Sequence, residues 1–92
     1  GFADREKPVR VTVTVCPRSL ADGGRIKSII WPSGGLVVAI RLPDGTQVIP
    51  SGNTKLDAGQ QLDFECRADD PDEVLDYLYG IVGRPPKGYF NA

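Results

Sequence analysis

The chain has 92 residues, which is enough for one domain built around one hydrophobic core. Hydrophobic residues make up 40% of it and charged residues 25%, as in an ordinary globular protein. Its 11 basic and 12 acidic residues give a net charge of -1, which argues against a nucleic-acid-binding protein, because such proteins need a basic excess to neutralise phosphates. The sequence contains no run of about 20 apolar residues and therefore predicts no membrane-spanning helix.

The two cysteines are predicted to stay free thiols. In the alternating segment 8–15 the valines share one face, which places the following Cys16 on the other face, whereas Cys66 falls on the apolar face of a later strand. Two thiols on opposite faces of one sheet cannot reach disulfide geometry, and free thiols favour a reducing, cytoplasmic compartment. The chain contains no His, so a Cys/His zinc site and a Cys–His nucleophile are excluded.

The predicted elements follow the order βαβββα, which gives a single small α+β domain. We expect residues 1–7 to form a flexible leader, 8–83 the folded domain and 84–92 a flexible tail. The first strand spans 8–15, where strict alternation indicates one buried face. A short amphipathic helix is expected next, because Ile26, Ile29 and Ile30 have helical spacing, and Pro32 ends it.

A hydrophobic β-hairpin is predicted at the centre of the chain, from Leu36 to Pro50. The continuous apolar run 36–40 is typical of a strand that is covered on both faces. Pro43 and Gly45 stand where a type I turn with a following left-handed residue needs them, so that 46–49 returns as the partner strand. Segment 62–66 is predicted as a fourth strand.

The last predicted element is a helix that begins after Asp70. Asp70 is a suitable N-cap, Pro71 suits the first helical position, and Glu73 completes a capping box. An apolar stripe contains Val74, Leu78 and Ile81 or Val82, and the helix stops at Gly83. The acidic residues around its start are explained by capping and by the helix dipole, because they lack the alternating ligands and the central Gly of a calcium loop.

Segment 26–62 resembles the TrkA-C domain, the C-terminal lobe of the module that regulates potassium conductance. The matching motifs are Ile26-x-x-Ile29, the hairpin strand Leu36-Val37-Val38-Ala39-Ile40-Arg41, the stretch Val48-Ile49-Pro50-x-Gly52-x-Thr54-x-Leu56, and Gly59-x-x-Leu62. The resemblance covers about residues 8–82. The order Ile30-Trp31-Pro32 before the hairpin is similar to the version at the C-terminus of some bacterial ClC-type chloride channels or exchangers.

The resemblance implies a regulatory domain on the cytoplasmic face of a membrane, fused to or associated with an ion transporter or channel for chloride, or for potassium or other cations. Such domains dimerise and bind a small ligand near the dimer interface. The absence of Met likewise leads us to expect that the sequence is a piece of a longer protein. Family members that bind cyclic di-AMP have Asp, Arg and Asn where this chain has Ser28, Ile30 and Leu36, so the sequence argues against that ligand.

The candidate ligand-binding residues lie at the rim of the hairpin: Arg41, Pro50, Ser51 and Thr54. The Arg41 guanidinium would suit an anion, although it could instead pair with Asp44 or Glu65. The cluster 50–54 could line a pocket or serve only as a turn. The candidate dimer interface comprises Ile29, Ile30, Trp31 and Leu36, although Trp31 could equally be a core residue. No catalytic residues, metal site or cofactor are predicted, and the chain is not expected to be an enzyme. A purely structural dimerisation domain without a ligand is the alternative.

Overall fold

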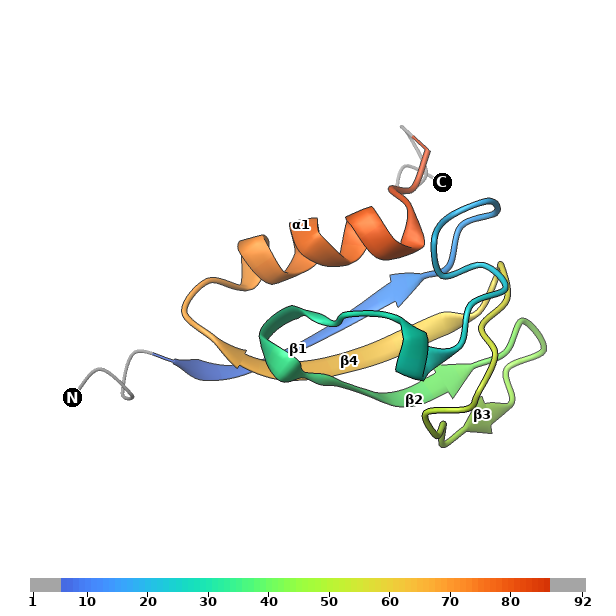
Figure 1. Ribbon diagram of the computed structural model, residues 1–92, viewed down its shortest axis with the longest axis horizontal. Coiled ribbons are helices and arrows are strands. Elements are labelled where there is room, and N and C mark those ends of the chain that lie inside the picture. The colour runs from blue at the N-terminus through green and yellow to red at the C-terminus, as the bar shows by residue number, and fades with distance from the viewer. Residues whose placement is uncertain (1–5, 87–92) are drawn as a thin grey trace.

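The computed structural model describes residues 6–86. Within them, four antiparallel strands form one sheet in the order β1-β4-β2-β3, and one α-helix follows the last strand (Figure 1). The bounds are β1 (Lys7–Thr14), β2 (Leu36–Arg41), β3 (Gln47–Val48), β4 (Gln61–Ala68) and α1 (Pro71–Val82). The predicted α+β class is confirmed. Most of the predicted leader (1–5) and tail (87–92) lies outside the described residues.

The sheet is centred on the long pairing of β1 with β4, which runs from Lys7 opposite Ala68 to Thr14 opposite Gln61. Along β1 the buried positions are Val9 and Val13, while Arg10 and Thr12 are exposed on the other face and Thr14 is half-buried. This pattern confirms the predicted alternation, which arises because successive side chains point to opposite faces of a strand. Cys66 lies opposite Val9, Cys16 lies beyond the end of β1, and both are free thiols.

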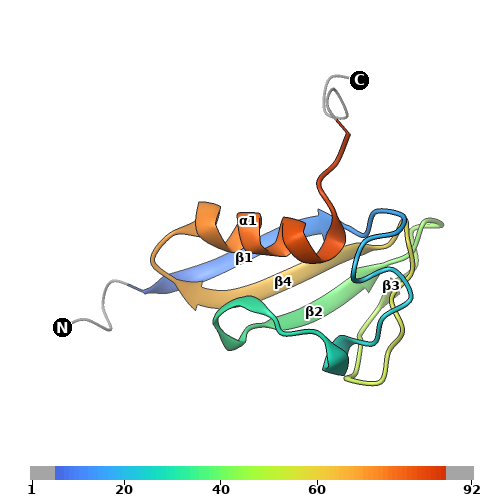
Figure 2. The same cartoon turned by 45° about the horizontal axis from the view of Figure 1, so that its top comes forward.

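Helix α1 covers one face of the sheet and lies over β1 and β4 (Figure 2). The Asp70 carboxylate caps it by accepting a hydrogen bond of 2.9 Å from the backbone N–H of Asp72. Pro71 occupies the first turn, and Gly83 ends the helix with a φ of 87°. These features confirm the predicted start and stop. The reciprocal bond expected from the Glu73 side chain is not among the hydrogen bonds of the described residues.

The predicted helix at 26–30 is wrong. Ile26–Ser28 forms one 3₁₀ turn, the chain then becomes extended, and Pro32–Gly34 forms a second short turn. The backbone N–H groups of Ile26 and Lys27 donate to the carbonyls of Thr54 and Gly52, at 3.1 and 2.8 Å. This long-range pairing with loop 51–54 holds the segment in place, and Pro32 stops any longer helix.

The hairpin is present, but its return strand is short. β3 has two residues, which pair with Ile40 and Arg41 of β2, instead of the four residues predicted. Gly45 takes the left-handed conformation that the turn requires, with a φ of 90°. The β2–β4 register shifts between Val37 and Ala39, and Leu36 at the start of β2 is 68% exposed. Three of its six residues, Val37, Ala39 and Ile40, are buried, so the strand is not covered on both faces throughout, as its apolar run had led us to expect.

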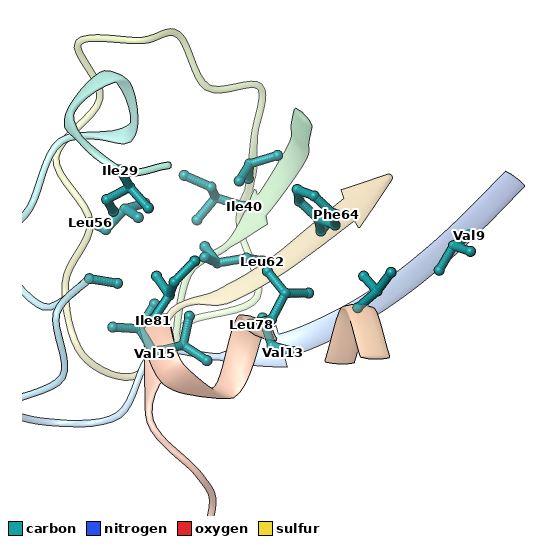
Figure 3. Close-up of a cluster of buried hydrophobic side chains, with 14 of the residues drawn as sticks. Val9, Val13, Val15, Ile29, Ile40, Leu56, Leu62, Phe64, Leu78 and Ile81 are labelled. Atoms are coloured by element: carbon teal, nitrogen blue, oxygen red, sulfur yellow. The ribbon is translucent and has the colours of Figure 1, made fainter. Parts of the chain in front are cut away.

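The hydrophobic core lies between the helix-facing side of the sheet and the layer formed by α1 and segment 26–34 (Figure 3). Its largest fully buried side chains are Phe64, Ile40, Leu56, Leu62, Leu78, Val15 and Val82. Gly35 brings the chain close to β4 before β2 begins. A Cβ atom at Gly35 would lie 2.5 Å from Cζ of Phe64, so no larger residue fits there without movement.

Candidate ligand-binding site

A small pocket lies beside the start of β2, where the segment before the hairpin faces the loop after it. We call it the hairpin-rim pocket. Its volume is about 180 Å³, and it is lined by Ile26, Trp31, Gly35, Leu36, Val37, Pro50, Ser51 and Gly52. Two of the predicted ligand residues and two of the predicted interface residues therefore meet at one cavity.

One wall of this pocket is loop 50–54, which is held by its own hydrogen bonds. The Thr54 hydroxyl accepts a hydrogen bond of 2.9 Å from the backbone N–H of Ser51, and the Ser51 carbonyl accepts one of 3.1 Å from Thr54. The loop is thus an ordinary turn and also a pocket wall, so both interpretations of the cluster hold. Thr54 shapes the loop but does not line the cavity.

The opposite wall is the indole of Trp31, which is half-buried. Its ring packs against Phe64 with the centroids 5.9 Å apart, and its Nε1–H donates to the Ile26 carbonyl at 3.1 Å. Trp31 therefore belongs partly to the core and partly to the pocket. These two contacts fix the ring and give the pocket a rigid apolar wall.

Arg41 does not reach the hairpin-rim pocket. Its neighbour Ile40 pairs with Leu62 in the core, so Arg41 points to the sheet face away from α1. There its guanidinium donates to the Gln61 side chain at 2.7 Å and lies 3.8 Å from the Asp63 carboxylate. These partners differ from the Asp44 or Glu65 expected from the sequence, because the register places Gln61 opposite Arg41.

Asp63 is the buried charged residue of the described chain, with 8% of its surface exposed. The Thr12 hydroxyl donates to it at 2.7 Å, and the Arg10 guanidinium lies 3.7 Å away. Arg41 completes this arrangement, in which two cations balance one carboxylate and the nearby Glu65. A charge-balanced network of this kind explains Arg41 as a structural residue of the open sheet face.

The four predicted interface residues lie in different surroundings. Ile29 is a core residue, 9% exposed, and offers little surface to a partner. Leu36 is exposed at the hairpin-rim pocket, whereas Ile30, 81% exposed, lines a separate hollow beside α1. Sequence reasoning missed Ile49, which is 76% exposed next to Pro50. No sequence signal singled it out, because the return strand was predicted to include Ile49, whereas β3 ends at Val48 and leaves Ile49 beyond the last sheet pairing.

The hairpin-rim pocket is lined mainly by apolar side chains, with Ser51 as a polar one, and Cys66 does not line it. Burial raises the pKa of the Cys66 thiol, with a smaller contribution from the Glu6 carboxylate, so this thiol is a weaker nucleophile than an exposed one. Among residues 6–86, no three His, Cys, Asp or Glu side chains gather closely enough to hold a metal ion. No helix within the same range has the length and apolar character needed to cross a bilayer.

No family model and no curated protein matches the sequence. The resemblance to the TrkA-C domain therefore stays a prediction that depends on the motifs of segment 26–62.

Proposed function

We propose that this chain is a ligand-sensing, dimerising regulatory domain of a membrane ion transporter or channel, on its cytoplasmic face, for chloride or for potassium or other cations. The observation that carries the proposal is the hairpin-rim pocket. There, Trp31 and Leu36, expected at a dimer interface, line the same cavity as Pro50 and Ser51, expected at a ligand. The segment that carries the TrkA-C resemblance is also the segment that forms this cavity.

Exposed apolar side chains beside the pocket support dimerisation. Leu36 is 68% exposed and Ile49 is 76% exposed, so two large apolar side chains face the solvent here. Burying apolar surface contributes about 25 cal/mol per Å², so a partner that covers both side chains gains stability. We propose that a second copy packs here and closes the pocket.

The size of the pocket also favours a shared site. Pockets for drug-sized ligands usually measure roughly 300–1,000 Å³, and this one measures about 180 Å³. One copy therefore holds only a ring or a short chain, whereas two copies facing each other would enclose more. The chemistry of the walls favours a mostly apolar ligand with one polar group, which the exposed Ser51 hydroxyl can bind.

The alternative is a purely structural dimerisation domain without a ligand. A thermal-shift panel of nucleotides, small anions, cations and aromatic acids, run beside a mass measurement in solution, separates the two. A sensing domain gains melting temperature with at least one compound, because a ligand that binds only the folded state stabilises it. In a sensing domain, that rise in melting temperature should disappear in Trp31→Leu. A purely structural domain would stay dimeric, and no compound would raise its melting temperature.

A further inference from the structure

A second hollow lies on the other side of segment 26–31, between it and α1. This α1 groove has a volume of about 570 Å³ and shares no lining residue with the hairpin-rim pocket. Its rim contains three of the five large apolar side chains that are exposed in the described chain: Leu20 at 68%, Ile30 at 81% and Tyr77 at 47%. The Tyr77 hydroxyl donates to the Ile30 carbonyl at 3.0 Å, which fixes one wall to the other.

Gly80 marks the same groove from the helix side. Glycine is among the least favourable residues inside a helix, and it is usually kept for a special backbone angle or for a close contact. Neither reason applies here, since Gly80 is not among the positive-φ residues and a Cβ atom built on it meets nothing within 4 Å. Gly35 and Gly83, in contrast, each have a neighbour within 3 Å of such an atom. The missing side chain at Gly80 leaves an open notch in the groove, which suits an apolar side chain inserted from outside.

The charges of α1 favour a basic partner. Its charged side chains are Asp72, Glu73 and Asp76, all exposed and all acidic, and Asp76 lines the groove itself. Arg84 pairs with Asp76 at 3.1 Å, which leaves an excess of two negative charges along this helix. Two copies of α1 packed face to face would bring like charges together, which disfavours a helix-to-helix contact between two copies at this groove.

We infer that the α1 groove binds a basic amphipathic helix from a cytoplasmic loop of the transport domain that this chain regulates. The inference rests on the proposed function, because cytoplasmic loops of membrane proteins are enriched in Lys and Arg. One apolar side chain of that helix fills the notch at Gly80 between Leu20 and Ile30, as in other helix-in-groove complexes. Its flanking cations lie beside Asp76 and Glu73. Contact at this groove links the regulatory domain to the part of the protein that moves ions.

The test uses the 92-residue chain and a fluorescently labelled 14-residue peptide of Leu and Lys at helical spacing, followed by fluorescence anisotropy. A scrambled peptide of the same composition and a Leu/Glu peptide are the peptide controls. A Cβ atom at Gly80 meets nothing within 4 Å, and Gln is a better helix former than Gly, so Gly80→Gln should place a side chain in the notch and keep the fold intact by circular dichroism. The double variant Glu73→Gln, Asp76→Asn removes two of the three acidic charges of α1, and Glu65→Gln on the opposite sheet face is a single-charge control.

We expect the Leu/Lys peptide to bind more tightly than both control peptides, and Gly80→Gln to weaken it at least about tenfold. The double variant should weaken it by about two- to fivefold and flatten the salt dependence, while Glu65→Gln changes nothing. Equal binding of the scrambled peptide, or unchanged binding by Gly80→Gln, would overturn the inference. The oligomeric state of the unmodified chain and of Gly80→Gln is measured in parallel by sedimentation. If Gly80→Gln dissociates a dimer, the groove is a contact between copies and the inference is wrong. If only peptide binding is absent while the dimer and its thermal shifts persist, the proposed function stands without it.

Discussion

Gly35 allows the start of β2 to approach β4 at a distance that no other residue permits. A Cβ atom at this position would lie 2.5 Å from the Glu65 carbonyl oxygen, 2.5 Å from Cζ of Phe64 and 2.7 Å from Cβ of Cys66. Optimal carbon contacts are roughly 3.5–4.0 Å, so three contacts with β4 are each about 1 Å too short. The backbone angles, φ -75° and ψ -178°, are open to any residue, and only the lack of space demands glycine.

Gly35→Ala should therefore destabilise the fold. Overpacking of this kind costs about 1–3 kcal/mol, while the lower entropy of the unfolded chain returns about 0.4–1 kcal/mol. We expect a net loss of about 2 kcal/mol in the free energy of unfolding, equivalent to about 10 °C in melting temperature for a domain of this size. Urea unfolding, followed by circular dichroism and by the fluorescence of Trp31, the only tryptophan, measures it.

Gly80→Ala is the matched control, because it makes the same substitution where a Cβ atom meets nothing within 4 Å. It should stabilise the chain by about 1 kcal/mol through helix propensity alone. A urea midpoint for Gly35→Ala equal to or above that of the unmodified chain, at an unchanged m-value, would refute the packing of segment 32–36 against β4.

The other predictions concern the helix cap and the titrating groups. Asp70→Ala should lower the free energy of unfolding by about 1 kcal/mol in urea, whereas Asp70→Asn, which can still accept the Asp72 N–H bond, should lose much less. Cys66 should react with iodoacetamide more slowly in the folded than in the urea-unfolded chain, as mass spectrometry can show, since burial raises its pKa. Equal alkylation rates in the two states would contradict the raised pKa. Because the folded state holds the thiol proton more tightly, the free energy of unfolding should fall as the pH rises past 9.0. Hydrogen bonds from Thr46 lower the pKa of Asp44, so its contribution to stability is present above 3.8 and is lost as the pH falls through the lower folded value. An NMR titration of the Asp44 carboxyl measures this pKa, and urea unfolding of Asp44→Asn should lack this part of the pH dependence.

Local sequence signals predicted the elements whose reasons are local. Alternation along 8–15 predicted β1, and Asp70 with Pro71 predicted the start of α1, because a strand period and a helix cap each depend on a few neighbouring residues. The turn at Gly45 followed from its need for a left-handed backbone. The hairpin-rim pocket was partly predictable too, since Pro50 and Ser51 were selected from a motif.

The features that depend on distant residues were not predictable in this way. Ile26 looked helical by spacing, but its backbone N–H bonds to Thr54, 28 positions away in a loop. Arg41 was expected to bind a ligand. The β2–β4 register instead places it opposite Gln61, so that it contacts Gln61 and Asp63 on the sheet face away from α1. The α1 groove was missed because it requires Leu20 and Gly80 to be adjacent in space.

In the proposed dimer, a second copy covers the exposed apolar side chains at the hairpin-rim pocket. Sedimentation velocity of the chain and of Leu36→Lys, from about 1 to 200 µM, measures whether this contact forms. At 68% exposure, Leu36 can become Lys without disturbing the core, so both chains should melt alike at low concentration. We expect a dimer for the unmodified chain and a monomer for Leu36→Lys. A monomer for the unmodified chain across the whole range, or a Leu36→Lys dimer as strong as the original, would contradict it.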